Sequence, residues 1–70
     1  MNQTKELKIT LRENQIITLL AYEHSTKEIA QKLFLSYDTV KTHRKNIMRK
    51  LGTKNIAGVV RVAFQRNILN

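Results

Sequence analysis

The segment from Ser36 to Gly52, SYDTVKTHRKNIMRKLG, restricts the fold most, because its apolar and charged residues separate at helical spacing. At about 100° per residue, Val40, Ile47 and Leu51 fall on one line of a helix. The opposite face carries Lys41, Thr42, Lys45 and Arg49. This pattern predicts one helix of a packed domain, with its apolar line against the core and its basic face exposed to solvent.

Three further segments show helical periodicity, and we expect helices from about Thr10 to Tyr22, Thr26 to Leu33 and Asn55 to Asn67. Two of them begin with a capping box, in which a hydroxyl and a glutamate three residues later satisfy each other's backbone amides. The expected apolar positions of the first two are Leu11, Ile16, Ile17, Leu20, Ala21, Ile29, Ala30 and Leu33. Ser36 is a good N-cap for the basic helix, and Gly52 suits its end. The sequence therefore predicts an all-α, four-helix domain.

Length and charge limit the organisation and the partner. Seventy residues allow one small domain, which we place at residues 9–70 after a polar tail at residues 1–8. The net charge of +8 favours a polyanionic partner, with nucleic acid ahead of an anionic membrane. The chain has no cysteine, which suits a reducing cytoplasm, and its N-terminus has no apolar core of a signal peptide; we expect a cytoplasmic protein. With no cysteine and two histidines, we expect no metal and no cofactor.

A short helix, a three-residue turn and a second helix with an exposed basic face match the helix-turn-helix plan, in which the second helix enters the major groove. Ser36, Asp38 and His43 could suggest a catalytic triad, but Ser36 is needed as a cap and a small bundle offers little room for a pocket. A membrane role is disfavoured because the other helices need the same apolar line. RNA is disfavoured because few aromatic residues could stack on bases. We therefore expect no enzyme.

The stretches TLRENQIITLLA, STKEIAQKLFLSYDTVKTHRKNIMRKLG and TKN resemble the LuxR/FixJ/GerE-type helix-turn-helix domain, over residues 9–69. This resemblance implies a bacterial regulator of transcription that binds DNA as a dimer on inverted half-sites, with the last helix at the dimer contact. RNA polymerase is a further candidate partner. The alternative is a protein-interaction module of the same fold that no longer reads DNA. Family members usually carry a receiver or ligand-binding domain, so the chain resembles the free-standing members or is an excised domain.

The resemblance also assigns residues by position. Base reading is implied for Lys41, Thr42 and Lys45. Phosphate contacts are implied for Thr26, Lys27, Thr39, Arg44 and Lys54, and Arg49 on the outward face is a further candidate.

Three positions depart from the family pattern. Glu23 stands where a glycine is common, Thr53 where an apolar residue is usual, and Ile56 where an arginine is common. An acid at Glu23 would repel phosphate if it pointed toward DNA. One capping or phosphate contact is therefore expected to be absent.

The fourth helix carries apolar residues on much of its circumference. We expect its inner face to consist of Ile56, Val59, Val60, Ala63 and Phe64. The outer face would then carry Gly58, Arg61, Val62 and Gln65. A glycine and an exposed valine there favour a contact with a second copy, although two tolerated residues on a solvated face would give the same pattern.

Three residues near the basic helix keep two interpretations each. Asp38 either favours the helix dipole in the first turn or accepts from a cytosine amino group, and we favour the dipole. His43 is expected to be packed and hydrogen-bonded rather than a metal ligand. Tyr37 either contacts phosphate or packs on Phe34.

Overall fold

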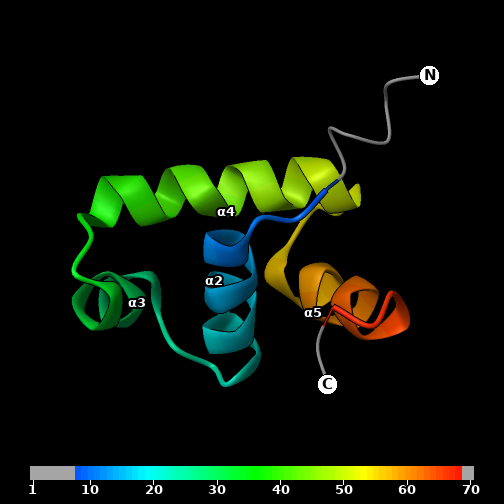
Figure 1. The fold of residues 1–70 in the computed structure, drawn as a ribbon, viewed down its shortest axis with the longest axis horizontal. Coiled ribbons are helices and arrows are strands. Elements are labelled where there is room, and N and C mark those ends of the chain that lie inside the picture. Colours follow the sequence, from blue (N-terminus) through cyan, green and yellow to red (C-terminus); the bar gives the residue numbers. More distant parts are fainter. Residues whose placement is uncertain (1–7, 69–70) are drawn as a thin grey trace.

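The computed structural model describes residues 8–68, which form four helices and no strand. The predicted tail at residues 1–8 lies almost entirely outside them. The helices are α2 (Leu11–Ala21), α3 (Thr26–Leu33), α4 (Tyr37–Leu51) and α5 (Ile56–Gln65) (Figure 1). The predicted all-α fold is confirmed, and each helix lies within two residues of its expected bounds.

Local hydrogen bonds explain where the helices begin. The Glu13 amide donates to the Thr10 hydroxyl at 3.0 Å, and the Thr10 amide donates to the Glu13 carboxylate at 2.9 Å. Ser25 and Glu28 repeat this exchange at the start of α3. Both predicted capping boxes are therefore confirmed.

The ends of α4 also follow the sequence signals. The Ser36 hydroxyl accepts from the Thr39 amide at 3.0 Å, so Ser36 is the N-cap. Gly52 ends the helix with φ of +67°, in the left-handed region that glycine adopts without strain.

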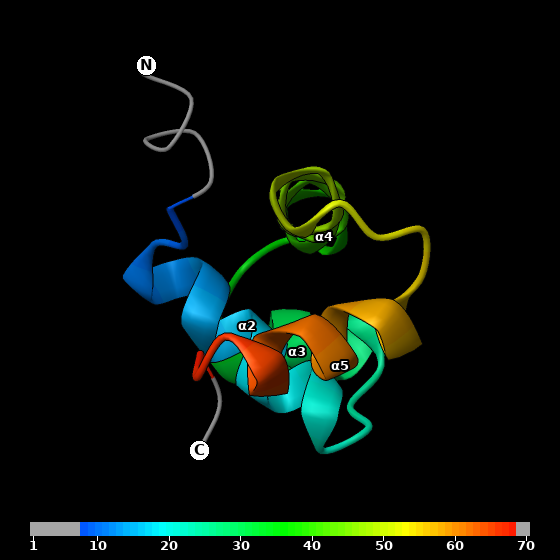
Figure 2. The ribbon, with the colours of Figure 1, turned by 90° about the vertical axis from the view of Figure 1, so that its right-hand side faces the viewer.

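The long helix α4 lies across the other three, and it contacts each of them. Figure 1 shows α2 between α3 and α5, with α4 above all three, and Figure 2 shows α4 end-on above the same group. The buried core contains Ile16, Ile17, Leu20, Ile29, Ala30, Val40, Ile47, Leu51, Val59, Val62 and Ala63. Within residues 8–68, the other helices cover α4 on one side, and its opposite face is exposed. Leu11, predicted to be part of the apolar stripe, is instead 88% exposed at the start of α2.

The orientation of α5 differs from the prediction. Val62 is 8% exposed and belongs to the core, whereas Phe64, expected inside, is 55% exposed. Val59, Val62 and Ala63 follow the spacing i, i+3, i+4, which turns the buried face by about a quarter of a turn from the expected one. The predicted exposure of Val62 is therefore wrong.

Gly58 also has an internal explanation. A Cβ atom at this position would lie 3.1 Å from the Cβ of Thr53, which is closer than ordinary packing. The glycine therefore lets α5 approach the loop that precedes it, and its presence needs no second subunit.

A buried ion pair joins α2 to the end of α4. Lys50 Nζ lies 2.8 Å from Glu13 Oε1 and 3.0 Å from Oε2, and it also donates to the Lys8 carbonyl at 3.1 Å. Burial by itself raises the pKa of Glu13, but the bonds from Lys50 and Thr10 outweigh it, so the pKa lies below its usual value. Lys50, one of the lysines of the Ser36–Gly52 segment, therefore stabilises the fold through this ion pair.

Candidate nucleic-acid interface

The open face of α4 presents one row of polar and charged side chains. Asp38, Thr42, Lys45 and Arg49 follow the spacing i, i+4, i+7, i+11 and are all exposed. Lys41 is exposed beside them. Since Val40, Ile47 and Leu51 are buried on the opposite side, the predicted base-reading residues Lys41, Thr42 and Lys45 all lie on the accessible face. Their contacts with bases remain a prediction.

The two flanks of this row differ in charge. One flank has a hollow of about 290 Å³ lined by Asp38, Thr39, Thr42, His43 and Asn46, which include no lysine or arginine. The other has a hollow of about 210 Å³ lined by Lys41, Arg44, Lys45 and Met48. The face of α4 is therefore divided into a basic side and a side without cations.

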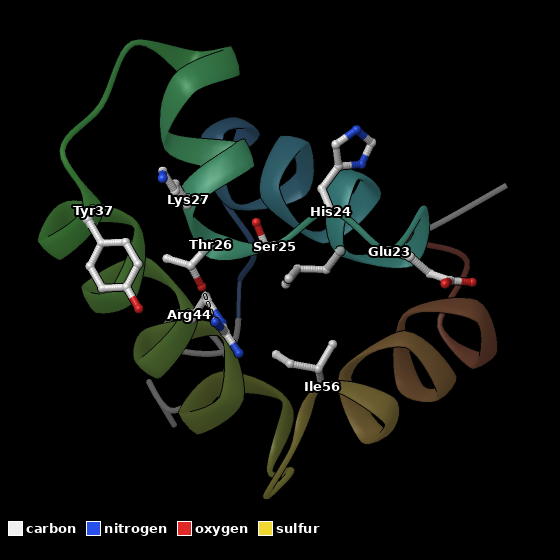
Figure 3. Close-up of a pocket in the computed structure, with 9 residues that line it drawn as sticks. Glu23, His24, Ser25, Thr26, Lys27, Tyr37, Arg44 and Ile56 are labelled. Carbon is white, nitrogen blue, oxygen red and sulfur yellow. Dashed lines mark hydrogen bonds between the residues drawn. The ribbon is translucent and has the colours of Figure 1, made fainter.

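A larger pocket, of about 550 Å³, lies where α3 begins (Figure 3). It is lined by Leu20, Glu23, His24, Ser25, Thr26, Lys27, Tyr37, Arg44 and Ile56. The first amides of a helix have no partner within it, so the start of α3 presents free N–H groups here. Arg44 lines both this pocket and the basic hollow of α4.

Arg44 is the link between the two helices. Its Nη1 donates to the Thr26 hydroxyl, which is buried, while its Nε is buried without a partner among the described residues. Three of the predicted phosphate ligands, Thr26, Lys27 and Arg44, are thus brought together. The structure adds a positioning role for Arg44, which no sequence signal indicated.

The match to known proteins agrees with this arrangement. The family described as "Bacterial regulatory proteins, luxR family" matches residues 7–63. The chain belongs to this family. It is a LuxR-type helix-turn-helix domain, the DNA-binding type of domain found in these transcription regulators.

Two relatives of this LuxR-type domain are longer proteins. Oxygen regulatory protein NreC of Staphylococcus aureus, in strains JH9 and JH1, is 42% identical over 69 residues, which are 97% of this chain and 32% of NreC. The crystal structure of response regulator ChrA of a heme-sensing two-component system matches with a TM-score of 0.86 and 35% identity, over 89% of this chain and 31% of ChrA. The chain spans about a third of the length of these relatives.

The remaining predicted phosphate ligands lie apart from the α3 pocket. The Thr39 hydroxyl accepts from the Ser36 hydroxyl at 2.8 Å and lines the cation-free hollow. Arg49 stands on the outward row of α4. Lys54 lines a hollow of about 540 Å³ between the α4–α5 loop and α5. A phosphate backbone would therefore meet this LuxR-type domain at separate places.

Glu23 adopts the conformation that glycine favours. Its φ of +67° lies in the left-handed region, which costs an L-residue about 1 kcal/mol. Figure 3 shows its carboxylate pointing away from Thr26 and Arg44. Glu23 thus keeps the backbone conformation that suits the glycine common at this position in the family. Its carboxylate lies at the rim of the pocket.

Thr53, the second departure, has a buried hydroxyl without a hydrogen-bond partner in the described part of the chain. A buried polar group left unpaired is unfavourable, and the usual apolar residue would avoid this. The third departure, Ile56, lines the α3 pocket with its apolar side chain, where the family's arginine would add a donor.

Tyr37 and His43 complete the site. Tyr37 lines the α3 pocket, and Lys41 Nζ lies 5.8 Å from the centre of its ring. Phe34 is 94% exposed, so Tyr37 does not cover it. His43 is half-buried as predicted, but no hydrogen bond to its ring is seen within residues 8–68. The spacing of Tyr37 and Lys41, one helical turn apart, could have indicated that they interact.

Within residues 8–68, no helix combines the length and the apolar character needed to cross a membrane.

Proposed function

We propose that this domain binds double-stranded DNA with α4 in the major groove and the start of α3 on the phosphate backbone. One observation carries the proposal: Arg44 joins the outward basic side of α4 to the pocket at the start of α3. A helix in the groove and a helix N-terminus on the adjacent backbone are the two contacts of helix-turn-helix docking.

In this arrangement Lys41, Thr42 and Lys45 read base edges. A lysine donates to the O6 and N7 atoms of guanine, and a threonine hydroxyl donates or accepts. Phosphates are bound by Thr26, Lys27 and Arg44 at the pocket and by Thr39, Arg49 and Lys54 around it. The guanidinium of Arg44 lines this pocket, and its positive charge favours an anion as a partner.

We propose that two copies bind inverted half-sites and meet through the exposed face of α5. This face carries Ala57, Arg61, Phe64 and Gln65, and Arg61 Nη1 donates to the Gln65 side chain at 3.4 Å. Arg61 and Gln65 thus keep their proposed place in the contact, and Gly58 borders it. A contact of this size is weak alone and becomes effective when DNA holds both copies close. The cytoplasm is the proposed location, and RNA polymerase is a proposed further partner.

Titration of random-sequence and selected duplexes at several salt concentrations tests the proposal. If each subunit neutralises about four to six phosphates, the logarithm of the binding constant should fall with a slope of about −4 to −5. A salt-independent interaction, or no binding to any duplex, would instead favour the protein-interaction alternative.

Single substitutions separate base reading from backbone contact. Lys45→Ala should relax the preference at one or two base pairs, whereas Lys27→Ala should weaken binding to all sequences about equally. Lys32→Ala is the matched control, because Lys32 is exposed in the last turn of α3, away from the pocket. If Lys45→Ala weakens all sequences equally, Lys45 contacts phosphate.

A further inference from the structure

We infer that Asp38 determines sequence specificity, by accepting a hydrogen bond from the N4 amino group of a cytosine in the major groove. This inference rests on the proposed function. It replaces our preference, from the sequence, for a role confined to the helix dipole.

The position of Asp38 places it among the residues that face the groove. It begins the outward row of α4, one turn before Thr42 and about two turns before Lys45. At 1.5 Å per residue, Asp38 and Lys45 lie about 10 Å apart along the helix, which corresponds to about three base-pair steps. Asp38 therefore reaches a different base pair from the one that Lys45 reads.

Among residues 8–68, the carboxylate of Asp38 neither caps the helix nor bonds to another side chain. Ser36, not Asp38, caps the helix by accepting from the Thr39 amide at 3.0 Å. Asp38 is exposed, and among residues 8–68 its carboxylate makes no ion pair or hydrogen bond. The nearest cation along the helix, Lys41, lies over the ring of Tyr37. An acidic residue on any face of the first turn would interact equally well with the helix dipole. The dipole therefore does not explain why Asp38 lies on the outward face.

The hollow on the Asp38 flank of α4 has no lysine or arginine in its lining. Asp38 lines this hollow together with Thr39, Thr42, His43 and Asn46, whereas Lys41 and Lys45 line the hollow on the other flank. In the groove, a carboxylate without a cation needs a donor from a base edge. Cytosine offers its N4 amino group, whereas guanine presents the acceptors O6 and N7 and thymine presents O4. Adenine offers an amino group next to the acceptor N7, and it should be intermediate.

Selection from a random DNA pool with the wild type, Asp38→Ala and Asp38→Asn tests the inference, followed by binding to four duplexes that differ at the affected base pair. We expect the wild type to prefer cytosine over guanine by about 10- to 100-fold at one position. Asp38→Ala should lose this preference, and Asp38→Asn should shift it toward adenine, which an asparagine contacts in bidentate fashion. All other positions of the selected site should stay the same.

Glu23→Gln is the matched control, since it removes one exposed negative charge at the rim of the phosphate pocket. It should raise the affinity for all four duplexes equally. If Asp38→Ala acts in the same uniform way, Asp38 merely repels the backbone, and the inference is wrong while the proposed function stands. If the wild type binds no duplex in a salt-dependent manner, both are wrong.

Discussion

Helices α4 and α5 are both half-covered by the core, but they expose opposite kinds of surface. The open side of α4 carries Lys41, Lys45 and Arg49, which attract phosphate and repel a second copy of the same helix. The open side of α5 exposes Ala57 and Phe64 beside Arg61 and Gln65. A surface with an exposed aromatic ring and little charge is better suited to contact protein. The proposed roles, DNA contact for α4 and subunit contact for α5, rest on this difference in side chains.

The largest expected effect comes from placing a charged side chain on the buried face of α5 rather than on its exposed face. Val62→Glu should destabilise the domain by at least about 4 kcal/mol, because it places an unpaired charge in the core. Thermal unfolding followed by circular dichroism would measure this. Phe64→Glu should leave the fold intact and abolish cooperative binding to a duplex with two half-sites. If Val62→Glu folds normally, Val62 is exposed and our description of α5 is wrong.

A second pair of variants compares two lysines of α4. Lys50→Met should lower the free energy of unfolding by about 3 kcal/mol, since it leaves the buried Glu13 carboxylate without its partner. Lys45→Met should change stability little and should reduce DNA affinity instead. Urea denaturation and DNA titration of both variants would separate the two roles, and equal stability of the variants would contradict the assignment.

The pH dependence of stability tests the same ion pair. Because the pKa of Glu13 is lowered in the folded state, its contribution is present above about pH 4.5 and is lost as the pH falls through the folded-state value. Urea denaturation between pH 3 and pH 7 should show this loss as a fall in the free energy of unfolding toward acid pH. In Glu13→Gln, most of this loss of stability at acid pH should disappear. The remainder is expected from Glu28, whose pKa is lowered by the hydrogen bond from the Ser25 amide.

The smallest expected effect concerns Thr53 in the loop between α4 and α5. Thr53→Val should stabilise the domain by about 1 kcal/mol, since it removes a buried hydroxyl without a partner and keeps the shape of the side chain. For a domain of this size the midpoint of thermal unfolding should rise by about 4–8 °C. Thr53→Ser is the control, because it keeps the hydroxyl and should not stabilise. A lower midpoint for Thr53→Val would show that the hydroxyl has a partner, such as an ordered water.

Much of the site could be predicted where charge marks one face of a helix. In α4, Lys41, Lys45 and Arg49 stand opposite a narrow apolar line, so the accessible face was assigned correctly. In α5, apolar residues surround most of the helix and the polar markers are few. Its buried face depends on how α2 and α4 meet it, and periodicity alone misplaced Val62 and Phe64.

The sequence by itself determined the helix boundaries, the fold class and the outward face of α4, because caps, periodicity and charge act over a few neighbouring residues. The tertiary structure alone decided which cations serve the fold and which remain free. Lys50 is paired because Glu13, 37 positions away in sequence, is buried beside it. Arg44 bonds Thr26 because α3 packs on α4. Such pairings depend on distances between helices, which no local pattern contains.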